Sequence, residues 1–169
     1  HSLARAKAKG YVVPKDMLDK LQVYLTNIET KFPKSYSQES RWTLSAYSYF
    51  VRELFGEKSP IPKARLMLLN VGLEKLSPEA IGWILSVLAN DKGSTAQVEE
   101  IKRHLLNRVT ETADKATFIN NYRDGEYVLL SSNRRADGVV LEGLLRESSS
   151  SSSSSGGSKK DSNDLIPKI

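Results

Sequence analysis

The chain has 169 residues, of which 39% are hydrophobic and 27% charged, and its formal net charge is +5. These values are ordinary for one globular domain, and no apolar run approaches the ~20 residues that span a bilayer. The sequence contains no cysteine, which excludes a disulfide scaffold, a thiolate zinc site and a cysteine nucleophile within this chain. Because the only histidines are His1 and His104, we expect no metal site and no cofactor.

The excess positive charge is concentrated at the start of the chain. Four of the five excess charges come from the first fifteen residues, which contain no acid and carry Arg5, Lys7, Lys9 and Lys15. The remaining residues are close to neutral and show no basic stripe interleaved with aromatic side chains. We therefore expect no nucleic-acid partner and no direct insertion of this segment into a membrane.

Two short helices are predicted before residue 33. Residues 3–9 are rich in Ala, Lys and Arg, which favour helix, and Gly10 is a natural stop. Pro14 can open the second helix at its first position, and Pro33 ends it. One apolar stripe at helical spacing runs along this second helix: Leu18, Leu21, Leu25 and Ile28.

A longer helix follows, capped by Ser37 or, less favourably, by Ser40, and closed by Gly56. Apolar side chains cover so much of its surface that we expect it to pack on more than one side. A proline-rich connector over residues 59–62 then leads to a short helix predicted over residues 63–70.

The next two helices have clear boundaries. One begins with Ser77 as cap, Pro78 at the first helical position and Glu79 in the first turn. A turn over residues 91–94 separates it from a helix predicted over residues 95–108.

Helical periodicity fades after residue 110. Residues 127–130 are β-prone and follow a turn, so we expect a short extended segment there. Ser132 or Asn133 then caps a last helix, whose apolar face carries Ala136 and Val140.

The chain is expected to divide into three parts. Residues 1–147 form the helical part, and residues 148–160, which begin with eight serines, form a disordered loop. Residues 161–169 hold the start of another helix. The predicted fold is therefore all-α, with paired antiparallel helices in a partial α/α toroid and one short extended segment.

No pair of carboxylates has the spacing of a catalytic site. Glu99 and Glu100 are adjacent and point to different sides of a helix, and Asp124 belongs to a turn. His104 has no identifiable orienting partner. We expect no catalytic residues and no enzyme activity, although a convergent carboxylate pair in a cavity would restore a glycan-processing enzyme as an alternative.

Several polar residues are expected to hold the structure together or to contact a partner. Arg134 and Arg135 lie in the first turn of the last helix, where the helix dipole disfavours a cation, so we expect fixed partners such as a carboxylate or loop carbonyls. Asp137 is favourable there. The remaining candidates are Asn107, Arg108 and Glu111, which could bond to one another where the helix gives way to irregular chain, and Trp83, which is expected to pack between helices.

Five stretches in order carry a family resemblance: residues 3–10, 76–83, 103–113, 132–142 and 164–168. Together they resemble the thioester-domain region of very large alpha-2-macroglobulin-like proteins of bacteria and microbial eukaryotes. The resemblance implies an α/α toroid, of which this chain would form about half. The serine run looks like a loop insertion. The seven structural candidates above, Trp83 to Asp137, match the recurring stretches of the family.

The resemblance also implies a role. Such proteins are secreted, periplasmic or cell-surface protease traps, many with a thioester formed in a Cys-x-Glu-Gln motif. Without cysteine, this chain holds no thioester residue. We expect a non-catalytic scaffold segment of a macroglobulin-like endopeptidase inhibitor, whose partners are other domains of the same polypeptide and target proteases. The alternative is a structural or adhesive module of a large cell-surface protein.

Overall fold

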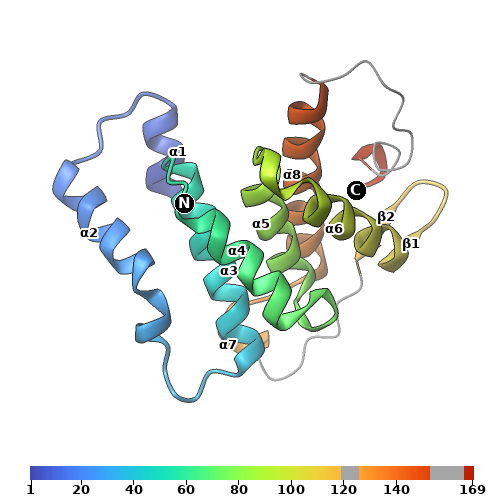
Figure 1. The fold of residues 1–169 in the computed structure, drawn as a ribbon, viewed down its shortest axis with the longest axis horizontal. Helices are drawn as coiled ribbons and strands as arrows, with labels where there is room; N and C mark the ends of the chain where they lie inside the picture. The colour runs from blue at the N-terminus through green and yellow to red at the C-terminus, as the bar shows by residue number, and fades with distance from the viewer. Residues whose placement is uncertain (119–125, 153–165) are drawn as a thin grey trace.

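The computed structural model describes residues 1–118, 126–152 and 166–169 and is mostly helical, which confirms the all-α prediction (Figure 1). The toroidal arrangement of the helix pairs stays a prediction. The α-helices are α1 Ser2–Ala8, α2 Lys15–Thr26, α3 Gln38–Leu54, α4 Pro60–Val71, α5 Pro78–Leu88, α6 Thr95–Arg108, α7 Glu126–Leu129 and α8 Asn133–Ser152. Short 3-10 helices cover η1 Ile28–Lys31, η2 Leu73–Lys75, η3 Lys92–Ser94 and η4 Ile166–Lys168.

Helix α5 is the centre of the core. Apart from Glu79, its residues are apolar or small on every side, and each one from Glu79 to Leu88 is buried. It packs most extensively on α8 and α3, with α4 and α6 covering its remaining sides. Figure 1 shows α5 between these elements, while α2 lies at the edge of the molecule. A helix without a polar stripe needs such cover on all sides.

The predicted caps position the main helices. The Ser37 hydroxyl accepts a hydrogen bond from the Ser40 amide at 3.1 Å, and the Ser77 hydroxyl accepts one from the Ala80 amide at 3.2 Å. Of the two caps considered for α8, Ser132 is the one observed, and its hydroxyl accepts a hydrogen bond from the Arg135 amide at 3.2 Å. Each cap satisfies an amide that has no partner within its helix.

The start of α4 and the end of α2 differ from the prediction. Helix α4 begins at Pro60, so most of the expected connector is helical. Pro60 and Pro62 fall in the first turn, where their missing amide hydrogens would have no helical partner in any case. Helix α2 ends at Thr26, and Ile28 belongs to the 3-10 turn η1 instead.

The stretch after α6 holds a small hairpin that the sequence analysis missed. Strand β1, Val109–Glu111, pairs antiparallel with β2, Ala116–Phe118, in a register that sets Val109 opposite Phe118. The prediction of an extended segment at residues 127–130 is wrong, because α7 makes Glu126–Leu129 helical. Leu130 then adopts a left-handed φ of 48° that ends this turn.

Helix α8 continues into the serine run, beyond the predicted limit at residue 147, so its first five serines are helical. Their hydroxyls donate back to helix carbonyls: Ser148 and Ser149 bond to the Leu145 oxygen at 3.0 and 2.8 Å. Ser150 also donates to the Ala89 oxygen at the end of α5, at 2.9 Å. The other serines and the cap predicted at residues 161–164 lie outside the described residues.

Candidate functional site

Arg135 forms the clamp that the sequence predicts, and its partner is a buried carboxylate. Its guanidinium donates two parallel hydrogen bonds to Glu79, from Nε to Oε1 and from Nη2 to Oε2, both at 2.8 Å. The Glu79 side chain is 0% exposed. Arg135 also donates to the Leu129 oxygen at 2.6 Å and the Leu130 oxygen at 3.2 Å. One side chain therefore joins the start of α5 to the α7–α8 link.

This geometry is a specific one. Two parallel charge-assisted bonds match the planar fork of arginine to a carboxylate, which lysine could not reproduce. Removing one partner of such a buried pair is strongly destabilising, because the other charge stays in a medium that solvates it poorly. The clamp thus fixes how α8 enters the core.

Asp137 and Arg134 have different roles from each other. The Asp137 carboxylate accepts a hydrogen bond from the Phe118 amide at 2.9 Å, and this bond ties β2 to α8. Arg134 is exposed, and the described part of the chain offers it no ion pair. The predicted arginine pair therefore separates into one anchor and one surface residue.

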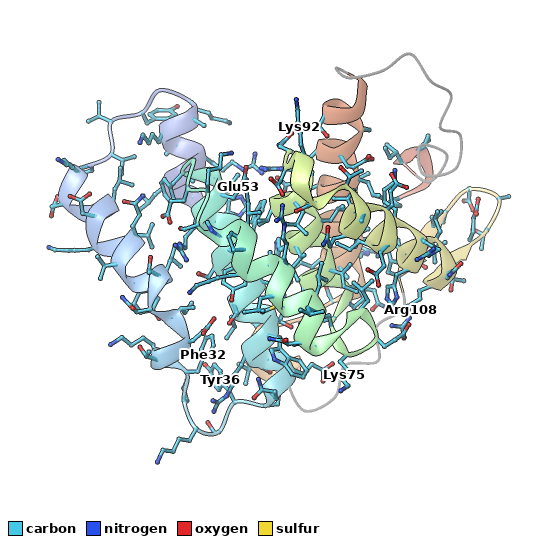
Figure 2. All side chains as sticks on the ribbon, viewed as in Figure 1. Phe32, Tyr36, Glu53, Lys75, Lys92 and Arg108 are labelled. Carbon is cyan, nitrogen blue, oxygen red and sulfur yellow. The ribbon has the colours of Figure 1, made fainter. Side chains whose placement is uncertain are left out.

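The residues predicted at the end of α6 lie on the surface. Arg108 approaches Glu74 on the α4–α5 link, with 3.5 Å between Nη1 and Oε2, and Figure 2 shows it at the end of α6. Both side chains are more than half exposed, so the pair contributes at most about 1 kcal/mol. Asn107 and Glu111 are exposed as well. Glu74 is a partner that the sequence analysis did not propose.

Trp83 packs between helices, as expected. It is 9% exposed and belongs to the core, and its ring lies 4.8 Å from that of Tyr47 on α3 at a tilted angle. Tilted aromatic pairs at this distance add to the free energy gained by burial alone. Trp83 thus supports the contact between α3 and α5.

Two glycines that the sequence analysis did not single out let α5 and α8 approach closely. A Cβ atom at Gly143 would lie 2.9 Å from the Gly82 oxygen, and one at Gly82 would lie 2.9 Å from Cγ1 of Val139. Either distance is shorter than real Cβ contacts. Glycine inside a helix costs about 1 kcal/mol relative to alanine, so its presence in two facing helices is a signal of close packing.

His104 is the strongest candidate for a catalytic group, and its surroundings do not support that role. Its Nδ1 atom lies 3.4 Å from Glu74, and its Nε2 atom is buried without a hydrogen-bond partner. Burial lowers the pKa of His104 and Arg108 adds to that effect, whereas Glu74 and Glu100 oppose it. A general base needs a substrate proton within hydrogen-bond reach, and buried Nε2 offers no such approach.

Glu99 and Glu100, the acidic candidates that the structure describes, do not form a convergent pair. Glu99 lies 3.5 Å from Lys102, one turn along α6, and Glu100 is exposed. Asp124 lies outside the described residues. Within the described ranges, no group of three or more His, Asp or Glu side chains is placed to hold a metal ion. No helix among them is long and apolar enough to cross a membrane.

Comparison of the chain with models of protein families, with curated proteins and with solved structures finds no match. The geometry of the residues therefore carries the functional argument.

Proposed function

We propose that this chain is a non-catalytic scaffold segment of a macroglobulin-like protease trap. The observation that carries the proposal is that two of the polar residues selected from the sequence, Arg135 and Asp137, bond to other parts of the fold. Arg135 holds Glu79, and Asp137 holds the Phe118 amide. These contacts join helices and the hairpin to one another, which is the work expected of a scaffold segment.

Uncovered apolar side chains support the proposed contacts with other domains of the same polypeptide. Large hydrophobic residues are exposed on α2 and α4: Met17, Val23, Tyr24, Leu66 and Leu69. A contact with another domain would remove these large apolar side chains from water. The five ordered stretches that resemble the thioester-domain region are the basis for proposing a macroglobulin-like parent with an extracellular, periplasmic or surface location.

The test uses the full-length protein that contains this chain. It is incubated with an endopeptidase such as trypsin, and the mixture is separated by size. A trap is expected to be cleaved at a limited site, to co-elute with active protease and to protect large protein substrates from it. Methylamine treatment followed by mass spectrometry then tests for a thioester upstream. Cleavage without retention of the protease would overturn the proposal.

A structural or adhesive module of a cell-surface protein is the second candidate. The absence of cysteine and the serine run at the end of α8 favour it, because neither contributes to covalent capture. Under this alternative, the full-length protein resists limited cleavage and retains no protease in the same experiment.

A further inference from the structure

A groove of about 440 Å³ opens between η1, α3 and α4. Trp42 and Tyr49 of α3, Leu66 and Met67 of α4, and Phe32 are among the side chains that line it. Figure 2 shows Phe32 and Tyr36 at the lower end of this region, where the chain turns from η1 into α3. The volume is within the range of sites that bind ligands.

Hydrogen bonds fix the shape of the groove. The Tyr49 hydroxyl donates to Glu29 Oε1 at 2.9 Å and so holds η1 against α3. Burial raises the pKa of Tyr49, and Glu29 raises it further, so the hydroxyl stays protonated and keeps donating. At the end of the groove, Arg41 donates to the Pro33 oxygen at 3.0 Å and to the Tyr36 oxygen at 3.1 Å. The site is thus formed before any ligand arrives.

The groove is elongated along helix α3. The lining residues on α3 run from Gln38 to Tyr49. At a rise of 1.5 Å per residue, this stretch of helix is about 16 Å long, or three turns. An amphipathic helix can lay its apolar face into a hydrophobic groove of this kind. This length favours a helical peptide over a compact small molecule.

The charge around the groove is positive. Arg41 donates its hydrogen bonds to carbonyl oxygens, which do not neutralise its positive charge. Lys63 also lines the groove and has no ion pair within the described part of the chain. Lys31 and Lys34 lie exposed beside Phe32. The one acidic side chain among the lining residues is Glu29, which already accepts the Tyr49 hydroxyl. A ligand with acidic side chains complements this surface.

We propose that the groove binds an amphipathic helix of a partner protein, with its apolar ridge on Trp42, Leu66 and Met67 and its acidic flank toward Arg41 and Lys63. Trp42 and Leu66 are the anchors, because a large aromatic and an exposed aliphatic side chain beside a preformed cavity gain most from desolvation. This inference does not depend on protease trapping, since the chemistry of the groove is the same in any larger protein.

The test titrates the whole 169-residue chain with two designed helical peptides of about 14 residues. Both carry leucine at i, i+3, i+4 and i+7, and their other positions are mainly glutamate in one and lysine in the other. Binding is followed by the change in tryptophan fluorescence, to which Trp42 in the groove should respond while Trp83, buried in the core, adds a constant background. We expect the glutamate peptide to bind at least tenfold more tightly, and added salt to reduce that difference.

Two residues of α4 provide a matched pair of variants. Leu66 lines the groove, whereas Leu69 does not, and they are 55% and 81% exposed. Because both are on the surface, Leu66→Asp and Leu69→Asp are expected to fold. Leu66→Asp and Lys63→Glu should weaken the glutamate peptide roughly tenfold or more, and Leu69→Asp should not.

Three outcomes would overturn the proposal. They are no binding of the glutamate peptide, equal binding of the two peptides, and equal loss in Leu66→Asp and Leu69→Asp. Sedimentation of the chain without peptide adds a further check. A dimer that Leu66→Asp dissociates would assign the groove to a second copy of this chain instead.

Discussion

Helices α5 and α2 are almost equal in length, with 11 and 12 residues, but their surroundings are opposite. In α5 every residue from Glu79 to Leu88 is buried, whereas in α2 only Leu25 is. The apolar stripe predicted α2, and the Ser77 cap with Pro78 and Glu79 in the first turn predicted α5. Apolar residues at helical spacing therefore predict a helix, and the total apolar content of its surface predicts how much of that surface neighbouring elements cover.

The largest difference is expected in the local stability of the two helices. Amide hydrogen exchange of α5 should require global unfolding, because α3, α4, α6 and α8 pack around it. Amides of α2 should exchange by local opening, with protection lower by about two orders of magnitude or more. Exchange followed by mass spectrometry of peptic fragments measures both. Equal protection of the α2 and α5 amides from exchange would contradict this expected difference in local stability.

The clamp on α5 gives the next largest effect. Arg135→Ala leaves the buried Glu79 carboxylate without its bidentate partner and should lower the free energy of unfolding by about 3 kcal/mol. Arg134→Ala is the matched control, because its exposed side chain should contribute less than about 0.5 kcal/mol. Urea denaturation measures both variants. A similar midpoint for the two would show that the clamp adds nothing to stability.

The close approach of α5 and α8 predicts a smaller effect. Gly143→Ala places a methyl group against the Gly82 oxygen and should destabilise the fold by about 1–3 kcal/mol. Gly138→Ala, on the same helix, meets no atom within 4 Å and should stabilise it by about 0.5–1 kcal/mol. Thermal melting distinguishes the two signs. Stabilisation by both substitutions would mean that the helices are less tightly packed than described.

The smallest effect concerns pH. Burial lowers the pKa of His104, so as the pH falls below its ordinary value of about 6.5 the unfolded chain binds a proton before the folded chain does. Stability should therefore decrease as the pH falls from about 7 toward the folded pKa. Glu74, Glu100 and Arg108 are the charged side chains that act on this ring: the two carboxylates oppose the effect of burial on the pKa of His104, and Arg108 adds to it.

The matched variant for this pH dependence is His104→Gln, which keeps a polar side chain that does not titrate. Urea midpoints at about pH 7.5 and pH 5.5 should differ less in the variant than in the original chain. If the two chains lose stability equally on acidification, His104 is not the responsible group.

Local signals explain which parts of the fold the sequence predicted. Ser37 and Ser77 are caps as expected, because capping depends on neighbours within four residues. Helix α6 has the predicted bounds of Thr95–Arg108, which follow a turn predicted from adjacent residues. The hairpin after α6 was missed since its strands have three residues each and are fixed by packing of Phe118 against the core.

Long-range contacts limited the prediction of the candidate site. The position of Arg135 in a first helical turn indicated that it needs a partner, but Glu79 lies 56 residues away and nothing local identifies it. The groove beside Trp42 likewise depends on how η1, α3 and α4 meet in space. The type of interaction could be inferred from sequence, and its partner could not.

The helical serines of α8 have a consequence for how this chain tolerates genetic variation. The last described tertiary bond of α8 is made by Ser150, and every position from 148 to 155 holds the same residue. Losing or gaining a serine in the run therefore puts another serine at the place that bonds to Ala89. We therefore expect the bond between the end of α8 and the end of α5 to be kept when the serine run changes in length by one residue.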